Sequence, residues 1–139
     1  MPEYILGIDY GSKRIGLAIG QSLTASASPL KVIANDNNLW QKLSDILKEW
    51  QIQHIIVGLP LNKDGSDQKF TVMTRKFADQ LQQKLSLKVD LHDERYTSFA
   101  AERAFQEQRA AGHKKSKDKD QIDAMAAQII LQSWLDENL

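Results

Sequence analysis

Carboxylate side chains occur at three separated places in this sequence where their surroundings could give them a chemical role. They are Asp9, the run Asp93-Glu94-Arg95, and Asp123. Asp9 ends an apolar run, the second group follows the apolar alternation of residues 87–91, and Asp123 lies in register with the apolar face of a helical pattern. Each also has an ordinary structural explanation: a turn aspartate, a solvated charge cluster, or an acid in the first turn of a helix.

If the fold brings these groups to one place, the carboxylates repel one another. Each pair at about 4–5 Å costs on the order of 3–4 kcal/mol at an effective dielectric constant of about 20. Either a carboxylate is then held protonated or a cation neutralises the cluster. Because every available ligand atom is an oxygen, Mg²⁺ or Mn²⁺ fits better than zinc or copper. Such a site can hold two ions roughly 4 Å apart and cleave a phosphodiester bond by in-line displacement.

The hydrophobic pattern of the sequence predicts the strands and helices that would position these acids, and its period changes along the chain. Apolar runs and alternation predict strands over residues 4–8, 14–20 and 30–33, with connections too short for a helix between them. After residue 38, helical stripes alternate with strands at 52–57 and 87–91. The predicted helices cover residues 39–50 and 70–85, a segment after Thr97-Ser98, and residues 122–134.

The order β-β-β-α-β-α-β-α-α predicts an α/β fold: a five-stranded mixed sheet, three antiparallel strands then two parallel ones, with helices on both faces. Strand 14–20 would place large apolar side chains on one face and the small Gly16 and Ala18 on the other. The first strand and strand 52–57 would form a crevice at their carboxyl ends, where open α/β sheets bind ligands. Asp9 lies at this edge.

Composition excludes several classes of protein. A chain of 139 residues predicts one compact domain, residues 1–139. Without cysteine, a disulfide framework, a thiolate metal site and a cysteine nucleophile are excluded. The apolar stretches are too short to span a bilayer, and acidic residues interrupt the region where a signal peptide would be apolar. We therefore expect a cytoplasmic protein that does not associate with membranes.

The 18 basic and 18 acidic residues cancel, so any affinity for nucleic acid must come from a local basic patch. A late segment supplies Lys114, Lys115, Lys117 and Lys119, and Lys13, Arg14 and Arg95 would extend it if the strand ends converge. We expect these side chains to contact phosphates, the alternative being a solvated loop. No aromatic ladder or recognition helix is evident, so specificity would come from nucleic-acid shape or from a partner. Of the histidines, His54 is expected inside a strand and His92 at the surface of its strand, the alternative for His92 being a supporting position beside the acids.

Four segments, in family order, resemble the motifs of the YqgF/RuvX family of ribonuclease H-like nucleases. They are residues 7–18 (GIDYGSKRIGLA), 57–65 (VGLPLNKDG), 93–98 (DERYTS) and 122–133 (IDAMAAQIILQS). The resemblance covers essentially the whole chain. It implies a ribonuclease H-like fold and three catalytic, metal-binding acids, which correspond here to Asp9, Glu94 and Asp123. Related resolvases place a second acid on the final helix, but the family motif does not reach Asp120.

The resemblance also implies an activity, that of a Mg²⁺- or Mn²⁺-dependent hydrolase acting on ester bonds. The family's usual assignment is cleavage in the 5′ leader of precursor 16S rRNA, with structured RNA and the small ribosomal subunit as partners. Some members are described instead as Holliday-junction resolvases of branched DNA, which would require a homodimer for paired cuts, whereas RNA cleavage allows a monomer. A third hypothesis is a non-catalytic factor that binds ribosomes or the transcription machinery. The residues themselves do not separate these functions.

Overall fold

The computed structural model describes residues 3–93 and 118–139. Within them a single sheet has the strand order β3-β2-β1-β4-β5. The elements are β1 (Tyr4–Tyr10), β2 (Arg14–Gln21), β3 (Ser26–Ala34), α1 (Leu39–Trp50), β4 (His54–Leu59), α2 (Lys69–Leu85), β5 (Lys88–Asp93) and α4 (Asp118–Asn138). The helix predicted after Thr97-Ser98 lies outside the described residues.

The strand pairing confirms the predicted mixed sheet. β1 pairs with β2 and β2 with β3 in antiparallel fashion, whereas β1 with β4 and β4 with β5 are parallel. β3 is longer than the predicted strand 30–33 because it begins at Ser26. Its first half contains serines and Pro29, and the ladder with β2 shifts register at that point. Proline is tolerated there because β3 is an edge strand, but an apolar-run criterion does not detect such a segment.

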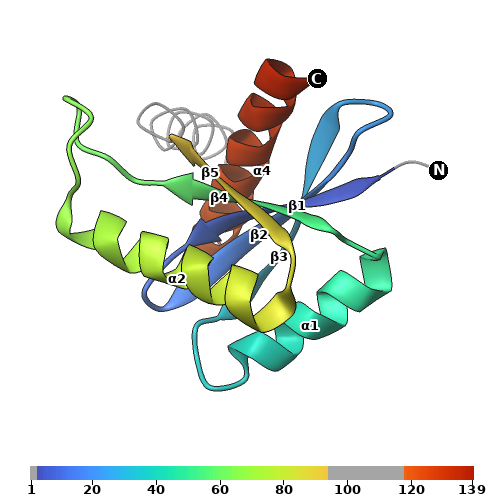
Figure 1. Cartoon of the computed structure of the whole chain (residues 1–139), viewed down its shortest axis with the longest axis horizontal. Helices are drawn as coiled ribbons and strands as arrows, with labels where there is room; N and C mark the ends of the chain where they lie inside the picture. Colours follow the sequence, from blue (N-terminus) through green and yellow to red (C-terminus); the bar gives the residue numbers. More distant parts are fainter. Residues whose placement is uncertain (1–2, 94–117) are drawn as a thin grey trace.

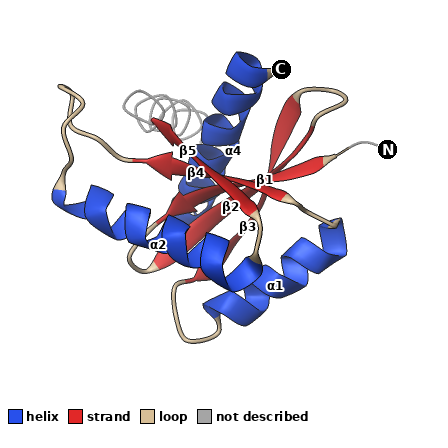
Figure 2. Ribbon diagram, in the orientation of Figure 1, coloured by secondary structure: helices blue, strands red, loops and turns tan. Residues whose placement is uncertain are grey.

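The helices cover both faces of the sheet, as predicted (Figures 1 and 2). α1 and α2 pack on the face to which Leu6, Ile8 and Leu17 point. α4 packs on the opposite face, against Ile5 and Ala18 among others. Side chains alternate between faces along each strand, so consecutive residues of β1 belong to different cores. Within the described residues, none of the helices combines the length and apolar character that a membrane span requires.

α4 lies unusually close to the sheet because the strands beneath it carry small residues. A Cβ atom added at Gly7 would lie 2.7 Å from Leu131 Cβ, and one added at Gly16 would lie 2.0 Å from the carbonyl oxygen of Asp123. Both distances are shorter than any van der Waals contact, so only glycine fits. α4 therefore packs on the face of β2 that carries the small residues Gly16 and Ala18.

Two glutamines fix the position of α4 along the sheet. The side-chain carbonyl of Gln132 accepts a hydrogen bond from the Ala27 backbone N–H at 2.9 Å, and its amide donates to the Ala25 carbonyl at 2.9 Å. The Gln128 amide donates to the Ala27 carbonyl at 3.1 Å. These bonds satisfy backbone groups of the edge strand β3 and of Ala25, the residue before it. They also hold α4 at one position along the sheet, and so fix the position of Asp123 relative to β2.

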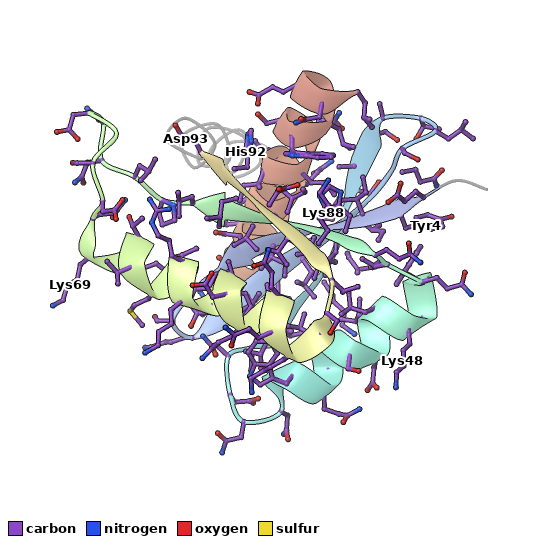
Figure 3. All side chains as sticks on the ribbon, viewed as in Figure 1. Tyr4, Lys48, Lys69, Lys88, His92 and Asp93 are labelled. Carbon is purple, nitrogen blue, oxygen red and sulfur yellow. The ribbon has the colours of Figure 1, made fainter. Side chains whose placement is uncertain are left out.

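The end of β5 differs from the sequence prediction. His92 is buried, with 8% of its surface exposed, whereas Leu91 is 39% exposed. His92 lies on the α4 side of the strand, where its Nε2 is 2.9 Å from Ser133 Oγ (Figure 3). The prediction of a surface position for His92 is wrong because α4 extends over this end of the sheet. His54 is buried in β4, as expected, and donates from Nε2 to Asp90 at 2.7 Å.

Candidate functional site

Asp9 lies on the α4 face of the sheet, near the carboxyl end of β1. It pairs with Gly16 of β2, and its neighbours Ile8 and Tyr10 point to the opposite face. Gly16 is the residue whose missing Cβ allows the backbone of Asp123 to approach. The glycine opposite Asp9 therefore admits the start of α4 to the site of the first acid.

Asp123 is held by a basic residue from β2. Arg14 donates a hydrogen bond from Nε to Oδ2 of Asp123 at 2.8 Å. The side chains are 39% and 24% exposed respectively, so the ion pair is partly shielded from solvent. A charge-assisted hydrogen bond of this kind fixes the orientation of the carboxylate. Arg14, predicted to contact phosphate, thus has a second role in the structure as the group that orients Asp123.

Asp9 is the electrostatically perturbed member of the pair. Burial raises the pKa of its carboxyl from 3.8 to about 7, and the negative charge of Asp123 contributes to the rise. Within the described part of the chain, no side chain donates a hydrogen bond to the Asp9 carboxylate. A half-buried carboxylate that faces another carboxylate without a compensating donor is costly to ionise. The arrangement favours a bound cation.

This perturbation predicts that the metal-free protein loses stability as pH rises. The folded state binds more protons than the unfolded state between pH 3.8 and about 7, so stability falls across that window and stays low above it. The loss is roughly 2–4 kcal/mol at pH 8, from the size of the shift. Asp9→Asn removes the titrating group, so we expect it to be more stable than the wild-type protein at pH 8. Urea unfolding at pH 5 and pH 8, both with chelator, measures the difference.

The matched control is Asp79→Asn, which makes the same change at an exposed position in α2. Its stability should follow the wild-type protein at both pH values. If Asp9→Asn and the wild-type protein lose stability equally between the two pH values, Asp9 is not the residue responsible.

The other predicted site residues divide into two groups. Lys13 is exposed on the turn between β1 and β2, and Lys119 lies in α4, although its side chain is not among those described. The remaining five lie outside the described residues: Glu94, Arg95, Lys114, Lys115 and Lys117. Asp9 and Asp123 are therefore the two predicted acids whose side chains are described, and residues 3–93 and 118–139 contain no cluster of three potential metal-ligating groups.

Asp9 and Asp123 nevertheless fit a hard divalent cation. Both offer carboxylate oxygens, which are the ligands that Mg²⁺ and Mn²⁺ prefer. Burial, and after it the negative charge of Asp123, raise the pKa of Asp9 to about 7, so ionising this carboxyl is costly even with Arg14 beside Asp123. A divalent cation would supply the compensating positive charge.

Sequence reasoning missed an aromatic stack on the opposite side of the same strand end. The Tyr10 ring lies 5.6 Å from that of Phe70 and 4.3 Å from that of Phe77, with interplanar angles of 22° and 23°. The helical stripe of residues 70–85 indicated a buried face of α2 but not its partner. The sequence signal for this contact is the position of Tyr10, next to Asp9 and at the end of a buried strand.

Comparisons with known proteins find relatives that match nearly the whole chain. The "Putative pre-16S rRNA nuclease" of Aeromonas salmonicida is 42% identical over 135 residues, which cover 96% of this chain and 94% of the relative. The protein of the same name from Haemophilus ducreyi is 42% identical over 140 residues and 99% of each chain.

Among solved structures, Thermus thermophilus RuvC in complex with a Holliday junction substrate superposes with a TM-score of 0.56. The match has 15% sequence identity and covers 96% of this chain and 93% of that one. At this identity the match supports the fold alone, and it confirms the predicted ribonuclease H-like class. The family model described as "RuvX: Holliday junction resolvase" matches residues 3–137, so this chain belongs to the RuvX family.

Proposed function

We propose that this protein is a metal-dependent endonuclease that hydrolyses phosphodiester bonds, with precursor 16S rRNA as its substrate. The observation that carries the proposal is the placement of Asp9 beside Asp123, acids from the first strand and the last helix, with the pKa of Asp9 raised to about 7. Unfavourable charge of this kind is retained at functional sites, where a ligand compensates for it. Family membership makes a nuclease the enzyme class to which the site belongs.

Each described residue then has a distinct task. Asp9 and Asp123 would hold the divalent cation, which would supply positive charge and Lewis-acid polarisation. Arg14 keeps Asp123 in the orientation needed for binding, through its Nε–H. Lys13, exposed on the adjacent turn, contacts a phosphate of the same strand. Glu94 is the proposed third acid on the basis of the sequence motif, and Arg95 and the lysines at 114, 115, 117 and 119 would extend the phosphate contacts.

The choice of RNA rests on the relatives. The curated relatives described above carry the name of a pre-16S rRNA nuclease, and they align over nearly their whole length. A Holliday junction is the second candidate, because the family description names it and because RuvC, with the same fold, was solved with that substrate. For this chain the junction would require two copies that cut symmetrically.

The two substrates can be separated directly. The purified protein is incubated with end-labelled precursor 16S leader RNA and with four-way junction DNA, each with Mg²⁺, Mn²⁺ or chelator. We expect cleavage of the RNA with either ion and none with chelator. Symmetric cuts in the junction, with intact RNA, would instead support the resolvase function.

Binding of the cation is measured independently of cleavage. Mn²⁺ at about 100 times its dissociation constant should stabilise the folded protein by about 2.7 kcal/mol, which raises the melting temperature by roughly 10 °C at this chain length. If neither nucleic acid is cut and Mn²⁺ changes the melting temperature by less than about 1 °C, the catalytic proposal fails. A non-catalytic binding factor would then remain.

A further inference from the structure

A shallow pocket lies on the other side of the strand end that carries Asp9. Its volume is about 290 Å³, and its lining consists of Tyr10, Met73, Lys76, Phe77 and Gln80. Phe77 is almost completely buried, with 2% of its surface exposed, whereas Met73 is 47% exposed at the rim. Apart from Tyr10, these residues come from α2, which runs beside the β1–β2 turn in Figure 1.

The floor of this pocket is formed by aromatic rings packed against one another. The Tyr10 ring stacks with both Phe70 and Phe77, and Trp40 lies against Phe77 with ring centroids 5.7 Å apart. A ligand that entered the pocket would therefore meet preordered aromatic edges and the Met73 thioether. Preordered surfaces of this type bind with little loss of side-chain entropy.

The pocket is connected to the acidic site by one exposed turn. Asp9 and Tyr10 are consecutive, and their side chains lie on opposite faces of the sheet. Lys13 is on the turn between the two faces, and Lys76 is at the pocket itself. Neither lysine forms an ion pair with another described residue. A nucleic-acid strand that crosses the turn from Asp9 to the pocket would pass the Lys13 ammonium group on the way and reach that of Lys76.

We propose that this pocket binds one unpaired nucleobase of the strand that is cut at Asp9, with Lys76 on its phosphate. The exposed Met73 thioether and the aromatic edges beneath it suit the face of a base, because sulfur and ring edges both pack favourably against an aromatic face. Sequence-tolerant contact with the bases is the usual way in which single strands are held. The Gln80 amide offers both a donor and an acceptor to a base edge. The proposal rests on the proposed nuclease function and adds to it that the strand is unpaired beside the cut.

The test uses a duplex with a single-stranded 5′ extension, prepared as RNA and as DNA. The fluorescent base 2-aminopurine is placed at each extension position in turn, and an abasic site replaces it in a second series. Binding is measured with Ca²⁺, a hard cation that suits carboxylate ligands, and a gel verifies that the strands remain intact. The variant is Met73→Glu, which places a negative charge at the rim of the pocket.

The control is Val72→Glu, the same change at the next residue of α2, which is 60% exposed and does not line the pocket. We expect fluorescence to be quenched at one extension position, and affinity to fall about tenfold in Met73→Glu but less than twofold in Val72→Glu. The abasic probe should weaken wild-type binding about tenfold and Met73→Glu binding no further. If only RNA behaves in this way, the pocket selects RNA.

Equal weakening by both variants, or an abasic probe that binds as tightly as the intact one, overturns the proposal. Its failure is distinct from failure of the proposed function. Loss of quenching with normal Mg²⁺-dependent cleavage removes only the pocket. Normal cleavage by Asp9→Asn together with the expected quenching removes the acidic site and leaves the pocket as a binding site for single strands.

Discussion

Replacing Asp9 with asparagine is expected to reduce Mg²⁺-dependent cleavage by on the order of a thousandfold. Asparagine keeps the size and shape of the side chain but removes the negative charge, so the site loses one of the two described carboxylates that we propose bind the cation. The burial that raises the pKa of Asp9 also means that an amide is tolerated better than an ionised carboxylate in the metal-free protein. The variant should therefore fold well but bind the cation weakly and fail in catalysis.

Two measurements keep this result interpretable. Circular dichroism and thermal melting establish that Asp9→Asn is folded, and the Mn²⁺-induced rise in melting temperature should be reduced or lost. Asp79→Asn, exposed in α2, should cleave at the wild-type rate. Cleavage by Asp9→Asn within about threefold of the wild-type rate would exclude Asp9 from the reaction, since a lost metal ligand cannot have so small an effect.

Much of the fold follows from hydrophobic period alone. In β2 the large residues alternate with Gly16 and Ala18, which predicts a sheet buried on both faces by different partners, and α4 occupies the small-residue face. The order of strands and helices then restricts the topology to a mixed sheet. The first half of β3 was not predicted, because its serines and Pro29 are residues that strands disfavour. Its extended conformation depends on pairing with β2.

The acids of the site were predictable, but their local partners were not. Asp123 is in register with the buried face of its helix, and Asp9 ends a buried strand, so both are visible as ionisable groups near apolar surroundings. The hydrogen bond from Arg14 to Asp123 joins residues 109 positions apart and depends on where α4 lies along the sheet. That position is fixed by the hydrogen bonds from Gln128 and Gln132 to β3, which cannot be predicted from the hydrophobic pattern.

The wrong prediction for His92 has the same origin. Alternation in β5 identifies two faces but not which face a distant helix covers. α4 extends far enough to bring Ser133 within 2.9 Å of His92, and the histidine face is buried as a result. Leu91, on the other face, is left 39% exposed beyond the edge of α2. Long-range packing therefore overrides local hydrophobicity at the end of an edge strand.

Gly16→Ala is expected to separate the two acids and to reduce cleavage about a hundredfold without touching a ligand. The new methyl group would lie 2.0 Å from the Asp123 carbonyl oxygen and 2.5 Å from its carbon. These are backbone atoms and cannot rotate away, so the start of α4 must move by about 1 Å or more to reach normal contact distance. The affinity for Mn²⁺ should fall with the cleavage rate, and the folded state should lose about 1–3 kcal/mol.

Gly20→Ala in the same strand separates this effect from simple overpacking beneath α4. Its methyl group would meet the ends of the Leu131 and Leu135 side chains at 3.0 and 3.1 Å, and such side chains can adjust. It would also lie 3.3 Å from the Ser26 carbonyl oxygen, a contact that a shift of a few tenths of an ångström relieves. We expect Gly20→Ala to lose stability but to retain its Mn²⁺ affinity and most of its cleavage. If both variants lose activity in proportion to stability, Gly16 acts only through packing. If Gly16→Ala alone loses Mn²⁺ affinity, the close approach of α4 to β2 is what brings Asp123 to Asp9.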